Sequence, residues 1–163
     1  MKVSVFGLKP FSDLLKDGFK KLGHKISSEG DLDLIYANDP RGYERSLALK
    51  KLNPKATLIF NLLDIPWHMP DIERQTNLLI EHFLSKADIV TVISFKVKKD
   101  LSKFTNIKTQ VIYNPRRDVY YDKNIQKDDS FLFVGRANDP VKRITLVRDS
   151  LSKIDNGLKN LKI

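Results

Sequence analysis

Ala56-Thr-Leu-Ile-Phe-Asn-Leu62 is the stretch that decides the fold, because almost every side chain in it is apolar. A strand with one face in water alternates apolar and polar residues, whereas a strand covered on both faces is apolar nearly throughout. Strands of the second kind belong to parallel sheets with helices on each face. The stretch therefore predicts an α/β fold built on a parallel sheet.

Short apolar runs recur on both sides of this stretch, separated by runs of helical period. Apolar side chains return on one face through residues 11–22, and Gly23 follows as a helix terminator. This alternation predicts right-handed βαβ units, and so a Rossmann-like parallel sheet with helices on both faces. The predicted strands cover residues 2–6, 32–37, 56–62, 88–93 and 110–113, and the predicted helices cover residues 11–22, 43–52, 71–86 and a stretch that Ser94 caps.

The last third of the chain departs from this order. Residues 114–129 combine Pro115 with many charged and amide side chains, as a linker does. Residues 131–134 are a new apolar run, and residues 140–154 have the pattern of one more helix. One strand and one helix are too few for a domain. We therefore predict a domain over residues 1–120, a linker over 121–129 and the incomplete start of a second domain over 130–163.

Composition indicates the cellular compartment of the protein. The chain has 163 residues, a formal net charge of +9 and no cysteine, so it forms neither disulfides nor thiolate metal sites. No apolar run approaches the roughly 20 residues that a membrane span needs. Pro10 and Asp13 interrupt the N-terminal run too early for a signal peptide. We therefore expect a cytoplasmic protein.

The signals for a cofactor or a metal are weak. The chain has no G-x-G-x-x-G string, which argues against dinucleotide binding. Asp31-Leu-Asp33 matches the DxD of metal-dependent sugar transferases, but it leads into a predicted strand instead of following one. The three histidines (His24, His68 and His82) lack ligand spacing. The sequence predicts neither a metal site nor a bound cofactor.

Residues 96–117 are strongly basic: they contain seven lysines and arginines and one acidic residue, Asp100. Such a segment indicates an anionic partner: lipid head groups, a nucleic acid or a phosphorylated substrate. No aromatic residues alternate with the bases, which argues against nucleic acid. Bases in the first turns of a helix that Ser94 caps would oppose its dipole. We therefore predict an anionic-surface site; the alternative is a solvated helix face. Its residues are Lys96, Lys98, Lys99 and Lys103.

Ligands of parallel sheets bind at the carboxyl ends of the strands. Gly7, Asn38, Asp39 and residues 64–68 follow the first three predicted strands. The run 131–134 ends in Gly135-Arg136, with Lys142 near the start of the next helix. A guanidinium and an ammonium beside a helix N-terminus suit a diphosphate leaving group. The alternative is a surface turn with unrelated bases.

The order of these motifs along the chain resembles that of the GT-B glycosyltransferases, especially the large retaining group that uses nucleotide sugars. The resemblance covers nearly the whole chain. It is carried by Gly7, Leu22-Gly23-His24-Lys25-Ile26, Asp33-Leu-Ile-Tyr36, Ala87-Asp88-Ile-Val-Thr-Val-Ile-Ser94, Val111-Ile-Tyr-Asn114-Pro-Arg-Arg-Asp118, Val134-Gly135-Arg136 and Lys142.

The resemblance implies an enzyme of the hexosyltransferase type. It would move a sugar from a nucleotide diphosphate sugar to a lipid-linked or saccharide acceptor, with retention at the anomeric carbon. Its donor diphosphate would lie on Gly135, Arg136 and Lys142. Its acceptor-side cleft would be lined by Gly7, Trp67 and His68, and Asp64 would be the carboxylate at the chemistry.

The chain also departs from the family. Leu63-Asp64 stands where the family has His-Asp, Arg143 follows Lys142 in place of glycine, and the chain ends at Ile163, before the family's nucleotide pocket. We therefore expect an incomplete transferase. Two alternatives stay open. One is an inactive or split transferase that needs a C-terminal-half subunit or a second copy. The other is a non-enzymatic Rossmann-like module with a basic, anion-binding face.

Overall fold

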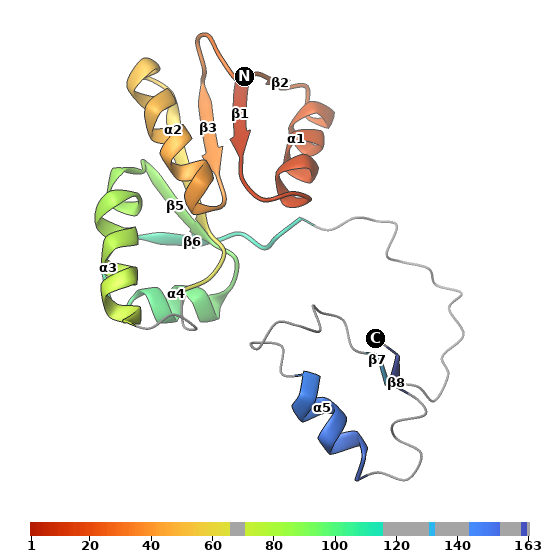
Figure 1. Ribbon diagram of the computed structural model, residues 1–163. Helices are drawn as coiled ribbons and strands as arrows, with labels where there is room; N and C mark the ends of the chain where they lie inside the picture. Colours follow the sequence, from red (N-terminus) through yellow and green to blue (C-terminus); the bar gives the residue numbers. More distant parts are fainter. Residues whose placement is uncertain (66–70, 116–130, 133–143, 154–160, 163) are drawn as a thin grey trace. The chain divides into compact units, whose positions relative to one another are not determined.

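A computed structural model describes residues 1–65, 71–115, 131–132, 144–153 and 161–162 (Figure 1). The chain divides into two compact units, Met1–Asp118 and Val119–Ile163. The predicted linker, residues 121–129, lies outside the described residues.

The first unit contains a six-stranded sheet in which every pair of neighbours is parallel. The strand order is β2-β1-β3-β4-β5-β6, and the prediction of a Rossmann-like α/β fold is confirmed. All carboxyl ends lie at one edge of the sheet, as the arrowheads in Figure 1 show. The strands are β1 (Lys2–Phe6), β2 (Lys25–Ile26), β3 (Leu34–Ala37), β4 (Thr57–Leu62), β5 (Ile89–Val92) and β6 (Thr109–Val111).

Helices cover both faces of this sheet. One face carries α1 (Phe11–Lys21), whose Leu15 and Phe19 pack on Val3, Val5 and Tyr36. The other face carries the remaining helices of this unit, which pack on alternate side chains of the same strands (Figure 1). They are α2 (Pro40–Leu52), α3 (Ile72–His82), the 3₁₀ turn η1 (Leu84–Lys86) and α4 (Phe95–Leu101).

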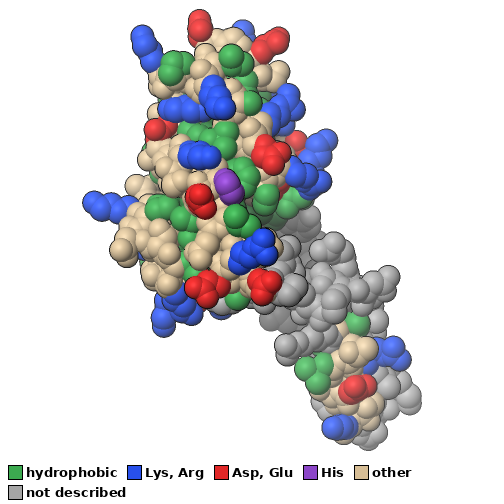
Figure 2. All heavy atoms as spheres, turned by 60° about the vertical axis from the view of Figure 1, so that its left-hand side comes forward, with side chains coloured by type: hydrophobic (Ala, Val, Ile, Leu, Met, Phe, Trp, Pro, Cys, Tyr) green, Lys and Arg blue, Asp and Glu red, His purple; other side chains and the backbone are tan. Residues whose placement is uncertain are grey.

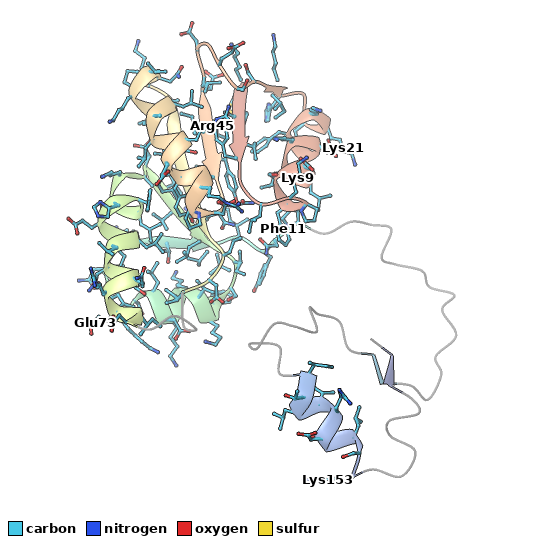
Figure 3. All side chains as sticks on the ribbon, in the orientation of Figure 1. Lys9, Phe11, Lys21, Arg45, Glu73 and Lys153 are labelled. Carbon is cyan, nitrogen blue, oxygen red and sulfur yellow. The ribbon has the colours of Figure 1, made fainter. Side chains whose placement is uncertain are left out.

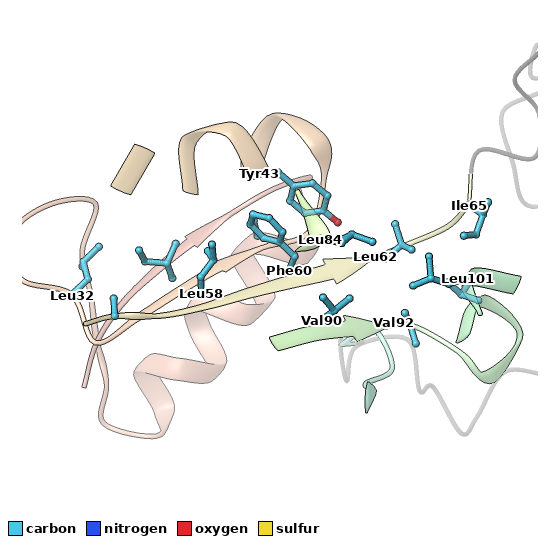
Figure 4. Packing of buried hydrophobic residues seen from close by; sticks show 14 residues of the cluster. Leu32, Tyr43, Leu58, Phe60, Leu62, Ile65, Leu84, Val90, Val92 and Leu101 are labelled. Atoms are coloured by element: carbon cyan, nitrogen blue, oxygen red, sulfur yellow. The ribbon is translucent and has the colours of Figure 1, made fainter. Parts of the chain in front are cut away.

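The larger core lies between β3–β5 and the second set of helices (Figure 4). The rings of Tyr43 and Phe60 stack with their centroids 4.4 Å apart, so α2 is held against the middle of β4. Phe60 and Leu62 belong to this cluster, whereas Ile59 packs with the cluster under α1. The strand is therefore covered on both faces, which is why its sequence is mostly apolar.

The structure corrects several predicted boundaries. β2 was not predicted, because two residues with an exposed lysine carry no periodic signal. α2 starts at Pro40, three residues earlier than predicted, because Asp39 caps it. α3 ends at His82, because Phe83 leaves the helical conformation (φ −127°, ψ −60°). Two predicted helix ends are confirmed. Gly23, which follows α1, has a left-handed φ of 78°. At the start of α4, Ser94 Oγ accepts the Val97 N–H at 3.2 Å.

The described parts of the second unit are α5 (Ile144–Leu151) and two short strands, β7 (Phe131–Leu132) and β8 (Leu161–Lys162), which pair in parallel. The predicted strand and helix of this unit overlap with β7 and α5. That this unit begins a nucleotide-sugar domain stays a prediction.

Asp88, which belongs to a motif of the resemblance, lies at the opposite edge of the sheet from the carboxyl ends. Its carboxylate accepts the Leu58 N–H at 2.7 Å and the Lys50 ammonium at 2.8 Å. The same ammonium donates to the Ala56 carbonyl at 2.6 Å. Burial on its own would raise the pKa of Asp88, but the Lys50 and Leu58 hydrogen bonds and the Lys50 charge lower it. Asp88 therefore ties α2 to β4 and β5.

We expect Asp88→Asn to lower the free energy of unfolding at pH 7 by about 0.5–1 kcal/mol, because the ion pair is partly open to solvent. Because the pKa of Asp88 is lowered in the folded state, the stabilisation by its carboxylate is fully present above the unfolded carboxyl pKa of about 3.9. It is lost as the pH falls through the pKa of Asp88 in the folded protein. Urea titrations from pH 7 to pH 3 measure it. Asp17→Asn is the control, because Asp17 is exposed on α1 and forms no ion pair with the residues that the structure describes. A difference from wild type that stays constant down to pH 3 would contradict this account.

Candidate functional site

The strand order reverses between β1 and β3, and this switch point brings Gly7 and Asn38 together. The chain leaves β1 through Gly7, whose φ of 139° is unfavourable for other residues. A Cβ at this position would fall on the Asn38 amide oxygen. That oxygen accepts the Leu8 N–H at 3.0 Å. The exit of β1 is therefore fixed against the exit of β3.

The N-terminus of α2 lies at the same edge and is closed by the chain itself. Asp39 Oδ1 accepts the N–H groups of Arg41 at 2.8 Å and of Gly42 at 3.2 Å. At Gly42 the helix comes so close to β1 that a Cβ would lie 3.2 Å from Phe6 Cβ. One turn further along α2, the guanidinium of Arg45 lies over the Phe6 ring, 5.0 Å from its centroid (Figure 3).

A hollow of about 500 Å³ opens beside these residues. Its lining comes from the loops after β1, β3 and β4 and from one side of α2 and α3. The described residues of the lining are mostly apolar. They are Leu8, Asn38, Asp39, Pro40, Tyr43, Leu62, Leu63, Asp64, Ile65, Gln75, Leu78, Leu79, His82 and Phe83.

Tyr43 forms part of the floor and acts as a structural group. It is buried, and its hydroxyl donates to the Asn61 carbonyl at 2.8 Å. Burial, followed by the neighbouring Tyr36 and Asp39, raises the pKa of Tyr43 far above its usual value. Burial also raises the pKa of Tyr36 to about 12, although its hydrogen bond with Thr91 opposes the shift. Neither phenol exchanges protons near neutral pH.

Two of the predicted cleft positions meet at this edge. Asp64 lines the hollow, and its carboxylate is exposed and accepts the Ile65 N–H at 2.8 Å. Gly7 directly precedes Leu8 of the lining. Trp67 and His68 lie outside the described residues, as do the predicted donor residues Gly135, Arg136 and Lys142.

Sequence reasoning missed the wall that α3 contributes. Gln75, Leu78, Leu79 and His82 all line the hollow. Their spacing of i, i+3, i+4 and i+7 places them on one side of the helix. That spacing was a usable signal for this side of the helix.

The structure corrects the interpretation of the basic segment. Asp100 pairs with Lys96 at 2.6 Å and with Lys103 at 2.9 Å, so two of the four predicted bases already have an anionic partner. Hydrogen bonds from Lys96 and then Lys103 lower the pKa of Asp100. Since α4 has only seven residues, Lys98 and Lys99 lie in its last turn, where the dipole favours cations. The predicted conflict with the dipole at these two positions is therefore wrong.

The described part of the chain contains no group of three or more His, Cys, Asp or Glu side chains that could hold a metal ion. Within the same residues, no helix is long and apolar enough to cross a membrane.

Comparisons with protein-family models, curated proteins and solved structures find no match for this chain.

We expect Gly7→Ala to lower the free energy of unfolding by at least about 2 kcal/mol, because it forces both an unfavourable φ and a collision with Asn38. Gly18→Ala is the matched control. It lies inside α1, where a Cβ meets nothing within 4 Å, and should stabilise the protein by about 0.5–1 kcal/mol. Urea unfolding of both variants tests this pair. Equal stability of Gly7→Ala and wild type would show that the switch point is not constrained as described.

Proposed function

We propose that this chain is the acceptor-side half of a GT-B-type glycosyltransferase, which moves a sugar from a nucleotide diphosphate sugar to an acceptor. The observation that carries the proposal is the hollow at the switch point, with Asp64 at its rim. Crevices at this place in a parallel sheet are where α/β proteins bind small ligands. The order of the sequence motifs supports the same assignment.

In this proposal the two units divide the reaction. The hollow holds the acceptor, and the exposed Asp64 carboxylate orients the acceptor hydroxyl or takes its proton. Gly135, Arg136 and Lys142 of the second unit hold the donor diphosphate and neutralise the charge that develops on it. The donor is a substrate, and the proposal needs no further cofactor.

Gly135, Arg136 and Lys142 would contact only the diphosphate of the donor. We therefore propose that the base and the ribose need further donor-binding surface, from a C-terminal-half subunit or from a second copy of the chain. Without it, a nucleoside diphosphate contacts half a cleft and binds weakly.

We expect UDP, GDP or ADP to bind the isolated chain no more tightly than the high micromolar range, and Arg136→Ala to weaken that binding at least about fivefold, since a charge-assisted contact is lost. Isothermal titration calorimetry measures both affinities. Arg148→Ala, which removes an arginine from α5, is the control and should leave the affinity unchanged. Submicromolar binding that is insensitive to Arg136→Ala would refute the donor assignment.

A second function is favoured by one observation on α4. Phe95 is 69% exposed at the start of this helix, and Lys98 and Lys99, also exposed, have no ion pair with any described residue. An exposed aromatic ring beside unpaired ammoniums suits an anionic lipid surface. Figure 2 shows a face of the molecule on which basic and acidic side chains are interspersed. We propose reversible attachment of a cytoplasmic protein to an anionic membrane.

We expect Lys98→Gln/Lys99→Gln to reduce binding to liposomes with 30% phosphatidylserine about tenfold or more, since each base near such a surface contributes roughly 1 kcal/mol. Sedimentation at low salt measures the partitioning. Lys20→Gln/Lys21→Gln makes the same charge change in the last turn of α1 (Figure 3) and is the control. An equal loss of liposome binding in both variants would indicate only an effect of net charge. Unchanged binding of Lys98→Gln/Lys99→Gln would refute the membrane site.

A further inference from the structure

The hollow at the switch point is apolar to a degree that a sugar site does not require. Its floor consists of the buried side chains of Tyr43, Leu62 and Ile65. Leu78 and Leu79 stand on the α3 side, and Leu78 is 38% exposed. Large apolar side chains open to solvent in a concave site indicate a ligand that covers them.

Three polar side chains of the hollow lie at its rim, whereas Asn38 and Asp39 are buried. Asp64, Gln75 and His82 are exposed there, where a hydrated group can reach them. Deeper in the site, the Leu8 N–H fixes the orientation of the Asn38 amide by donating to Oδ1.

We propose that the acceptor is amphipathic: an apolar group, an alkyl chain or an aromatic ring, fills the hollow, and the hydroxyl that receives the sugar stays at the rim near Asp64. That this ligand is the sugar acceptor rests on the proposed function, whereas the binding of an apolar group in the hollow does not. A volume of about 500 Å³ is within the range of pockets that enclose small molecules.

The same features argue against the other occupants. A bare saccharide carries a hydroxyl on almost every carbon, and the apolar floor would leave those hydroxyls without partners at a cost in affinity. A second copy of the chain would be held by a broad surface of about 800 Å² on each partner, whereas this site is a small concavity. The occupant with the best fit is therefore a small amphipathic molecule.

The test compares two glucosides that differ only in their apolar part, n-octyl β-D-glucopyranoside, kept below its micelle concentration, and methyl β-D-glucopyranoside. The full chain is labelled at its Ile and Leu methyl groups and titrated by NMR. We expect the octyl compound to shift the Leu62, Ile65 and Leu79 methyl signals and to bind at least tenfold more tightly. Each CH₂ removed from water contributes about fourfold, so burial of two CH₂ groups suffices.

Leu78→Gln places an amide on the wall and should weaken the octyl compound about fivefold or more. Leu22→Gln is the matched control, because Leu22 is 73% exposed just after α1 and outside the hollow. The spectrum of each variant reports whether it is folded. Should Leu78→Gln fail to fold, the two glucosides and the shift pattern of the wild type decide the question.

Equal affinity for the two glucosides, or shifts that spare the methyl groups of the hollow, would overturn the inference. Equal weakening by Leu78→Gln and Leu22→Gln would overturn it too, since it indicates nonspecific adsorption. None of these results involves a nucleotide. Octyl glucoside binding with no effect of Arg136→Ala on nucleoside diphosphates would keep this inference and reject the glycosyltransferase proposal, and the reverse pattern would reject this inference alone.

Discussion

Parallel pairing of β1 with β3 is the constraint on which the first unit depends. Two parallel strands cannot be joined by a hairpin, so each connection must cross a face of the sheet. The right-handed connection from β1 to β2 places α1 on one face, and the connections from β3 onwards place α2, α3 and α4 on the other. The chain therefore turns away in opposite directions from β1 and β3. That divergence opens the edge at which Gly7 and Asn38 meet.

Much of this architecture was predictable, because a strand that is buried on both faces of a sheet is composed mostly of apolar residues. The run 56–62 has to be apolar to lie between two helix layers, and Gly23 has to adopt a positive φ where a helix ends. The two residues of β2 could not be found in this way. They are a strand only because the end of α1 returns them to the side of β1, and their own side chains carry no pattern.

The site was predictable to the extent that it depends on where strands end. Gly7 and Asp64 follow strands, and order along the chain is sufficient to place them at one edge. The α3 wall depends on how that helix is rotated about its axis, which packing of Ile72 and Ile80 on the larger core fixes and local sequence does not. The basic segment was misjudged for a related reason. A count of charges could not show that Asp100, on the inner side of α4, receives both Lys96 and Lys103.

The Asp39 cap has a consequence for which molecules this edge can select. In many α/β proteins the free amides of a helix N-terminus attract phosphate. Here the amides of Arg41 and Gly42 are occupied by a fixed carboxylate of the same chain. An incoming anion would find these two amides already occupied, and the carboxylate that occupies them also pairs with the Arg41 guanidinium at 3.8 Å. The Asp39 side chain thus takes the place that a bound anion holds at the helix N-termini of such proteins.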